Sequence, residues 1–224
     1  MEHTEIVRLA ALATGDEKHE ASSYSTLDAL AVLYGEVLRV DPADPHWDER
    51  DRFILSKGHG PAAFYAVLCL RGFFPEAWLP GFMTWGNPLG AHPDRTLVPG
   101  VEASTGSLGH GLALGVGTAL ALRARNLDGP RTVVLTGDAE LNEGSNWEAI
   151  LLAPQLGLGN LTLVVIDNHS SELDLRPLDG KLTAFGWDTR TVGGRDHGAL
   201  RDTLVRRHPD RPTAVVADIS KEPA

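Results

Sequence analysis

The stretch TVVLTGDAELNEG (132–144) decides the fold of this chain, together with its counterpart LTLVVIDNHSS (161–171). Each begins with a continuous run of apolar and β-branched residues, which is typical of strands covered on both faces of a parallel sheet. The first run breaks at Gly137 and Asp138, and the second breaks at Asn168. Asp138 and Asn168 lie 30 residues apart, the length of one strand-helix-strand unit. We therefore predict two parallel strands joined by a helix in an α/β fold.

The residues that end these two strands indicate a metal site. The carboxyl ends of parallel strands meet at one edge of a sheet, so Asp138 and Asn168 are predicted to face one crevice. A carboxylate and an amide oxygen, without cysteine or histidine ligands, suit Mg²⁺ or Ca²⁺ rather than zinc. A diphosphate at the start of the helix after Asp138 would supply further oxygen ligands. The alternative is structural, because such an aspartate is often a helix N-cap and such an asparagine a turn residue.

Length and charge limit the classes of protein to which the chain can belong. Its 224 residues suffice for one well-buried domain, which we expect to span residues 1–224. The net charge of −10 argues against nucleic acid or an anionic membrane as a partner. In so acidic a chain, a diphosphate ligand would need a metal ion. The single cysteine, Cys69, excludes an internal disulfide and suits a reducing compartment.

No segment of the sequence predicts export or a membrane span. Glu2 and Glu5 interrupt the basic and then apolar layout of a signal peptide. The longest apolar run, 112–122, is shorter than the roughly 20 residues that a helix needs to cross a bilayer. We therefore expect a cytoplasmic protein.

Strands and helices alternate along the rest of the chain. Further strands are expected at the start of 52–60, at 187–192 and at 213–218, and helices at 62–70, 178–185 and 199–206. This alternation predicts a doubly wound, mostly parallel sheet flanked by helices.

Two local patterns predict further details of the helices. Ser25 with Asp28 resembles a capping box, which would open a helix at that point. Small residues recur at about one turn in the segment that follows residue 108, which predicts a helix packed closely on a neighbour. The residues of this stripe are Gly109, Ala113, Gly117 and Ala121.

Four blocks in a fixed order resemble the transketolase family. They read DRFILSKGHG (51–60), GAHPD (90–94), PGVEASTGSLGHG (99–111) and GDAELNEG (137–144), and the last continues to Trp147, Glu148 and Ala149. Together they cover most of the chain and are far more specific than a single Gly-Asp pair. The chain is similar to the N-terminal, thiamine-diphosphate-binding half of a transketolase encoded as a separate subunit, with the fold of the diphosphate-binding module.

The resemblance implies a thiamine diphosphate cofactor held with Mg²⁺ or Ca²⁺. The metal would be bound by the side chains of Asp138 and Asn168 and by the backbone carbonyl of Ser170. Gly137 and Ala139 would offer their backbone to the diphosphate.

The resemblance also implies contacts to the pyrimidine ring and to the substrate. The backbone of Gly106 and Leu108 would contact the aminopyrimidine. His19, His59 and His92 would line the substrate channel and exchange protons with sugar hydroxyls, a task that suits imidazole because its pKa lies near neutrality. On the residues alone, each histidine can also be a structural part of a turn or a surface loop.

Two acidic residues resemble those at the subunit interface of the family. Glu143 and Glu148 would lie between paired active sites. Without the resemblance, they are equally consistent with a solvated helix face.

The sequence departs from the family pattern at several positions. His19 is followed by Glu20, where the family usually has proline. Ala139 stands in place of a glycine, which requires that its backbone avoid positive φ. His169 and Ser170 replace the usual Gly-Leu or Gly-Ile after the metal-binding asparagine.

The family resemblance implies a reaction and a partner. In this family a glutamate on a second, pyrimidine-binding module activates the cofactor, and we find no such module in this sequence. We therefore expect a subunit that transfers a two-carbon ketol unit from a ketose to an aldehyde, with a sugar or sugar-phosphate substrate and a separate pyrimidine-module partner. We also expect the chain to dimerise and to form a heterotetramer with that partner. Two alternatives stay open: a subunit of a 2-oxo acid decarboxylase or dehydrogenase, and a catalytically silent cofactor-binding partner.

Overall fold

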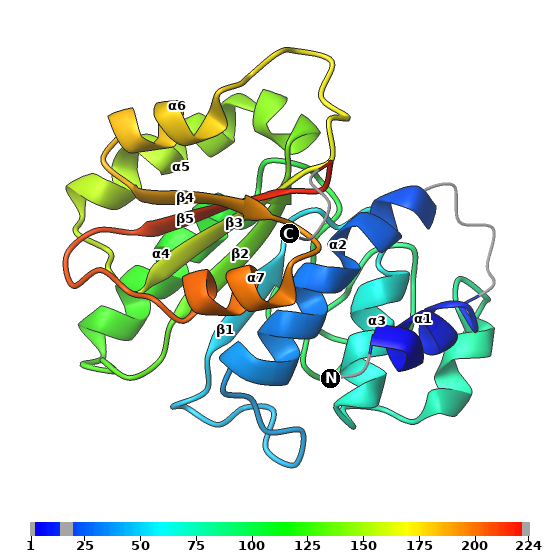
Figure 1. Cartoon of the computed structure of the whole chain (residues 1–224). Coiled ribbons are helices and arrows are strands. Elements are labelled where there is room, and N and C mark those ends of the chain that lie inside the picture. Colours follow the sequence, from blue (N-terminus) through cyan, green and yellow to red (C-terminus); the bar gives the residue numbers. More distant parts are fainter. Residues whose placement is uncertain (1–2, 14–19, 221–224) are drawn as a thin grey trace.

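Five parallel strands form one sheet in the computed structural model, which describes residues 3–13 and 20–220 (Figure 1). The strand order across the sheet is β1-β2-β3-β5-β4, and every neighbouring pair is parallel. The predicted α/β fold with a parallel sheet is confirmed. The strands are β1 (Arg52–Leu55), β2 (Thr132–Gly137), β3 (Leu161–Asp167), β4 (Asp188–Gly193) and β5 (Thr213–Asp218).

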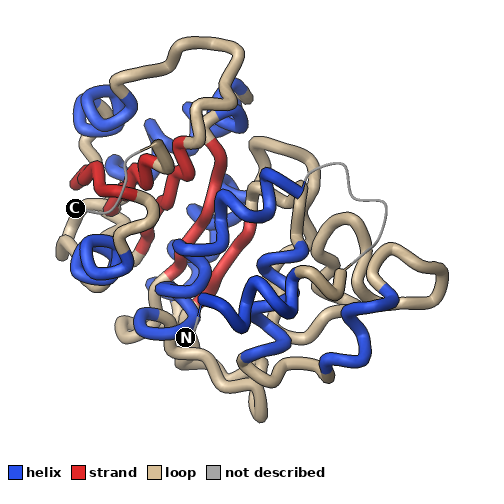
Figure 2. Tube along the Cα trace, turned by 45° about the vertical axis from the view of Figure 1, so that its right-hand side comes forward, coloured by secondary structure: helices blue, strands red, loops and turns tan. Residues whose placement is uncertain are grey.

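Helices cover both faces of the sheet, as the turned view in Figure 2 shows. One face carries α1 (His3–Ala10), α2 (Glu20–Val32), the short π-helical segment η1 (Leu33–Val37), α3 (Ala62–Leu70) and α7 (His197–Leu204). The other face carries α4 (Gly111–Ala124), α5 (Gly144–Gln155) and α6 (Leu178–Ala184). Two short 3₁₀ helices, η2 (Glu76–Gly81) and η3 (Ala139–Asn142), lie in connections. Among the described helices, none is long and apolar enough to cross a membrane.

Alternate side chains of the strands feed two separate hydrophobic cores. Phe53 and Val133 pack in the core beneath α2, α3 and α7. Ile54 and Val134 pack in the core beneath α4, α5 and α6. All residues of β2 and β3 are buried, which explains why both strands read as continuous apolar runs in the sequence.

Helix α4 packs closely on the sheet through Gly111 and Gly115. A Cβ on Gly115 would lie 2.3 Å from Val134 Cγ2, and a Cβ on Gly111 would lie 2.3 Å from Ser56 Oγ. The predicted stripe through Gly117 is wrong as the packing face, because a Cβ there would meet no atom within 4 Å. The stripe faces away from the sheet, since the helix turns the preceding glycines inward.

The capping box predicted at Ser25 and Asp28 is wrong, because α2 already begins at Glu20 and contains both residues. Ser25 Oγ donates to the carbonyl of Ser22, one turn earlier, at 2.8 Å. The Asp28 carboxylate lies 2.8 Å from Nε2 of His197, the first residue of α7. Both side chains therefore make contacts within and between helices, and the short motif did not mark a helix start.

Exchange of Gly115 for alanine should destabilise the protein, because the added Cβ would meet buried Val134 at 2.3 Å. Overpacking of a core costs about 1–3 kcal/mol. Gly117→Ala is the matched control on the same helix: its Cβ meets open space, and alanine stabilises a helix interior by about 0.5–1 kcal/mol relative to glycine. Urea unfolding followed by circular dichroism measures both changes. A Gly115→Ala protein as stable as the parent would contradict the packing described for α4.

Candidate functional site

The carboxyl ends of β2 and β3 carry the two residues predicted to bind metal. The strands pair in parallel with Gly137 opposite Ile166. The Asp138 N–H donates a hydrogen bond to the Ile166 carbonyl at 3.0 Å. Asp138 and Asn168 therefore leave neighbouring strands at the same edge of the sheet, as predicted.

The Asp138 carboxylate is buried and accepts hydrogen bonds from two segments. The Ala139 N–H donates to Oδ1 at 2.8 Å, which makes Asp138 the N-cap of η3. In the loop after β3, the N–H groups of Ser170 and Ser171 donate to Oδ2 at 2.8 and 3.2 Å. The structural alternative for Asp138 thus holds for its Ala139 contact, while the same carboxylate also joins the ends of two strands.

The oxygen atoms at this edge suit a hard cation. Ser170 Oγ lies 2.9 Å from Asp138 Oδ1 and 2.7 Å from Asn168 Oδ1. In residues 3–13 and 20–220, no group of three His, Cys, Asp or Glu side chains could hold a metal ion. A cation here would rest on one carboxylate and neutral oxygens, a set that fits Mg²⁺ or Ca²⁺ completed by phosphate oxygens. A cavity of about 20 Å³ beside Asp138 and Asp167 has room for one water molecule.

The backbone at Ala139 meets the condition for alanine in place of glycine. The described residues other than glycine with positive φ are Met83, Asn126 and His169. Ala139 therefore avoids the left-handed region. That conformation falls instead on His169, whose φ is 59° and which directly follows Asn168.

His59 and His92 lie side by side on different loops. Their ring centroids are 5.2 Å apart, with the ring planes at 78°. A Cβ on Gly106 would lie 2.7 Å from the His92 ring, and its φ of 137° also requires glycine. A Cβ on Gly58 would lie 2.8 Å from the Gly106 backbone nitrogen. The loops marked by the sequence motifs therefore meet at one point, which brings together two of the three predicted histidines.

The other predicted site residues differ in what can be said of them. His19 lies outside the described residues, so its role in the substrate channel stays a prediction. Leu108 is half-buried, and its carbonyl lies 3.3 Å from His110 Nδ1. Glu143 and Glu148 are exposed, and Glu143 is the N-cap residue of α5. Their interface role stays a prediction as well.

Glu140 is a buried carboxylate that the sequence motifs did not single out, and it connects three loops. Oε1 accepts hydrogen bonds from Ser56 Oγ at 2.5 Å and from the Gly109 N–H at 3.0 Å. Oε2 accepts one from the Gly137 N–H at 3.4 Å. Burial raises the pKa of Glu140 above its ordinary value. The carboxylate thus fixes the loops after β1 and β2 and the loop before α4 relative to one another.

Lys57 is a second buried charge whose role the sequence did not reveal. Nζ donates to the Ser22 carbonyl at 2.6 Å and to Ser25 Oγ at 2.8 Å. Desolvation lowers the pKa of Lys57 to about 8, because neighbouring carboxylates only partly offset the loss of water. The ammonium ties the loop that bears His59 to helix α2. Lys57 and Glu140 both stand inside motif blocks, but only the packing of the loops reveals that they are buried.

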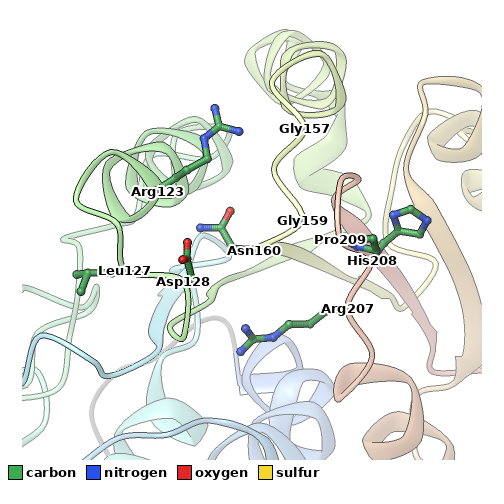
Figure 3. Close-up of a pocket in the computed structure, with 9 residues that line it drawn as sticks. All are labelled: Arg123, Leu127, Asp128, Gly157, Gly159, Asn160, Arg207, His208 and Pro209. Carbon is green, nitrogen blue, oxygen red and sulfur yellow. The ribbon is translucent and has the colours of Figure 1, made fainter.

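A separate cavity of about 370 Å³ opens at the other edge of the sheet, before the amino ends of β2, β3 and β5 (Figure 3). Arg123 and Arg207 border this cavity. Arg123 donates to the Leu156 carbonyl at 2.5 Å, and Arg207 donates to the Gly129 carbonyl at 2.9 Å. The cavity is therefore a gap between loops that its arginines hold together, and none of the predicted site residues lines it.

The sheet and its polar edge define a class of protein: a parallel α/β domain whose crevice suits a phosphate ligand bound with a divalent cation. Residues 3–218 match the family described as the transketolase, thiamine diphosphate binding domain. The chain belongs to the transketolase family, as its thiamine-diphosphate-binding part.

Relatives of known name resemble most of the chain. One of the two subunits of apulose-4-phosphate transketolase from Actinobacillus succinogenes is 40% identical over 215 residues, covering 91% of this chain and 76% of that protein. The 6-deoxy-6-sulfo-D-fructose transketolase subunit SqwG from a Clostridium species is 35% identical over 213 residues, covering 91% and 77%. The predicted resemblance to the N-terminal half of split transketolases is confirmed. The chain is accordingly a transketolase-type enzyme subunit of the transferase class.

A third relative carries a different name. The protein named Ferredoxin fas2 from Rhodococcoides fascians is 48% identical over 211 residues, covering 94% of this chain and 69% of that protein. This chain has one cysteine, whereas iron–sulfur clusters are held mainly by several cysteine thiolates. The name therefore adds no redox role to this chain.

Solved transketolases share the fold. A mutant transketolase from Pichia stipitis superposes with a TM-score of 0.84 at 29% identity, covering 96% of this chain and 36% of that one. Transketolase from Leishmania mexicana gives a TM-score of 0.77 at 26% identity, covering 97% and 36%. This chain spans about a third of the length of the solved transketolases that it matches.

Replacement of Lys57 by methionine should change how stability depends on pH. The pKa of Lys57 is about 8 in the fold and ordinarily 10.5, so the unfolded chain binds more protons between these values. The buried charge therefore costs most below pH 8, and this cost disappears as the pH rises toward 10.5. The stability advantage of Lys57→Met over the parent should shrink by up to about 3 kcal/mol across that range. Urea unfolding at a series of pH values measures it, and a constant difference would contradict the burial of the charge.

Proposed function

We propose that this chain is the diphosphate-binding subunit of an enzyme that transfers a two-carbon ketol unit from a ketose donor to an aldehyde acceptor. The observation that carries the proposal is the meeting of His59 and His92 on loops fixed by Glu140 to the same end of the sheet as Asp138 and Asn168. Thiamine diphosphate, when bound, supplies the carbanion stabilisation that such a transfer needs. Membership of the transketolase family favours this reaction over that of a 2-oxo acid decarboxylase.

The chain's own oxygen and backbone groups would hold the cofactor. The side chains of Asp138 and Asn168 and the carbonyl of Ser170 would bind Mg²⁺, or Ca²⁺ in its place. The backbone of Gly137 and Ala139 would face the diphosphate. Gly106 and Leu108, on the loop packed against His92, would offer backbone contacts to the aminopyrimidine.

The paired histidines would bind and deprotonate the sugar. Two imidazoles 5.2 Å apart can contact neighbouring hydroxyl groups of one substrate. His59 is half-buried and His92 is exposed, so both can reach a ligand. Each would accept a proton from a hydroxyl and return it, a role for which imidazole is suited near neutral pH. His19 would join them on the loop before α2.

A partner subunit would complete the site. Two relatives are named as subunits of a transketolase. Helices α4 and α5 also present an exposed apolar surface, and exposed apolar patches mark association sites. The exposed leucines on it are Leu114, Leu120, Leu151 and Leu152.

We assign this surface to a pyrimidine-module partner. Glu143 and Glu148, exposed on the same α5, would lie at its rim, between paired sites. The assembly would be a dimer of this chain with two partner subunits. The chain itself would form one domain, because both hydrophobic cores share a single sheet.

The substrate would be a sugar or a sugar phosphate. Relatives are named for apulose 4-phosphate and for 6-deoxy-6-sulfo-D-fructose, which are sugars with an anionic group. In a chain with a net charge of −10, an anionic substrate would depend on locally placed cations or on the partner for its binding.

Asp138→Ala should abolish Mg²⁺-dependent binding of thiamine diphosphate, because it removes the only carboxylate that we assign to the cation. Isothermal titration of the cofactor into the assembled complex measures this loss, and circular dichroism checks that the fold survives. Asp128→Ala is the matched control, since Asp128 borders the cavity at the other edge of the sheet (Figure 3). Unchanged cofactor affinity in the Asp138 variant would remove it from the site.

Replacing His59 or His92 by alanine should lower turnover by about 10²-fold or more, as expected for a lost general acid or base. Cofactor affinity should stay nearly constant, because neither imidazole is assigned to the metal or the diphosphate. Steady-state kinetics of the assembled enzyme separate the two effects. His208→Ala, at the distant cavity, serves as the control. Normal turnover in either variant would exclude that histidine from the mechanism.

A further inference from the structure

We propose that the hydroxyl of Ser170 is a further ligand of the divalent cation, beside the side chains of Asp138 and Asn168. The inference rests on the proposed function, because it requires a cation at this edge of the sheet. It concerns the side chain of Ser170, whereas the family resemblance implies only its backbone carbonyl.

The spacing of three side-chain oxygens supports this assignment. Ser170 Oγ lies 2.9 Å from Asp138 Oδ1 and 2.7 Å from Asn168 Oδ1. In an octahedral Mg²⁺ site with metal–oxygen bonds of about 2.0–2.1 Å, adjacent ligand oxygens are about 2.9 Å apart. Ser170 Oγ therefore already has the spacing of a ligand next to each of the other two.

The count of protons among these oxygens also calls for a cation. A hydroxyl has one proton to donate, while an ionised carboxylate and an amide oxygen only accept. Whichever oxygen receives the Ser170 proton, the other contact, at 2.7 or 2.9 Å, has no hydrogen between its oxygens. A cation at this point resolves the conflict, because all three oxygens then direct lone pairs at it.

The turn before Ser170 is held by specific contacts. His169 has a φ of 59°, a conformation that residues other than glycine rarely adopt. Arg176 Nη1 donates to its Nδ1 at 2.5 Å. Nε2 therefore carries the ring proton and donates it to Asp218 Oδ1 at 3.3 Å. With the ring fixed on both sides, the turn directs the N–H and Oγ of Ser170 to Asp138.

The next residue provides a matched comparison. The Ser171 N–H also donates to Asp138, at 3.2 Å. Its hydroxyl, however, contacts Asn142 Oδ1 at 3.1 Å and the Leu173 carbonyl at 2.8 Å, away from the assigned ligands. Alanine at either position keeps the backbone N–H and removes one hydroxyl, so only the Ser170 exchange should reach the cation.

The test is titration of Mn²⁺ into the assembled enzyme with saturating thiamine diphosphate, followed by electron paramagnetic resonance. Ser170→Ala should weaken Mn²⁺ binding by about tenfold, the lower end of the range for groups that support a metal site. Water-proton relaxation should rise, because a water molecule takes the vacated position on Mn²⁺. Ser170→Thr, which keeps the hydroxyl, should bind Mn²⁺ like the parent, and so should Ser171→Ala.

Two results separate failure of this inference from failure of the proposed function. If Ser170→Ala binds Mn²⁺ as tightly as the parent or more tightly, with unchanged relaxation, the hydroxyl is no ligand, while loss of binding in Asp138→Ala would leave the proposed site intact. If Asp138→Ala also binds Mn²⁺ like the parent, the cation is not bound at this edge and both proposals fall.

Discussion

The parallel pairing of β2 with β3 is the constraint on which the site depends. Its register sets Gly137 opposite Ile166, so that two chain segments leave the sheet together. The Asp138 carboxylate can then accept hydrogen bonds from its own helix start and from the loop after β3. A slip of one residue would turn the buried side chains of a strand to the opposite face, which both hydrophobic cores oppose. The packing of the sheet thus fixes the position of polar atoms that contribute little to the core themselves.

Two buried charges hold the loops around this edge at a cost in stability. Ionisable groups lose hydration when buried, and apolar residues of similar size often pack at lower cost. Here the partners of Glu140 are a serine hydroxyl and two backbone amides on three different loops. Lys57 in turn ties the loop of His59 to helix α2. These contacts fix the relative positions of His59, His92 and Asp138 before any ligand binds, which reduces the ordering that binding would require.

The sequence was sufficient for those features that follow from periodicity and from strand ends. The buried runs of β2 and β3 indicated the parallel sheet, and Asp138 and Asn168 followed as neighbours at its edge. Local motifs were less reliable: Ser25 with Asp28 lies inside a helix, and the stripe through Gly117 faces away from the sheet because Gly111 and Gly115 make the close approach. Glu140 and Lys57 stand inside recognised blocks, yet their burial depends on loops distant in sequence. The orientation of Ser170 likewise depends on Arg176 and Asp218, which no local pattern connects to it.

The central claim is that this chain is one half of a split ketol-transferring enzyme. Its most direct test is ketol transfer and mass by light scattering for the purified chain, before and after addition of a transketolase-type pyrimidine-module subunit. The account predicts a dimer without turnover for the chain alone, and a heterotetramer that transfers a two-carbon unit from a ketose phosphate once the partner is added. Ketol transfer by the purified chain alone, at stoichiometric occupancy of thiamine diphosphate, would contradict it.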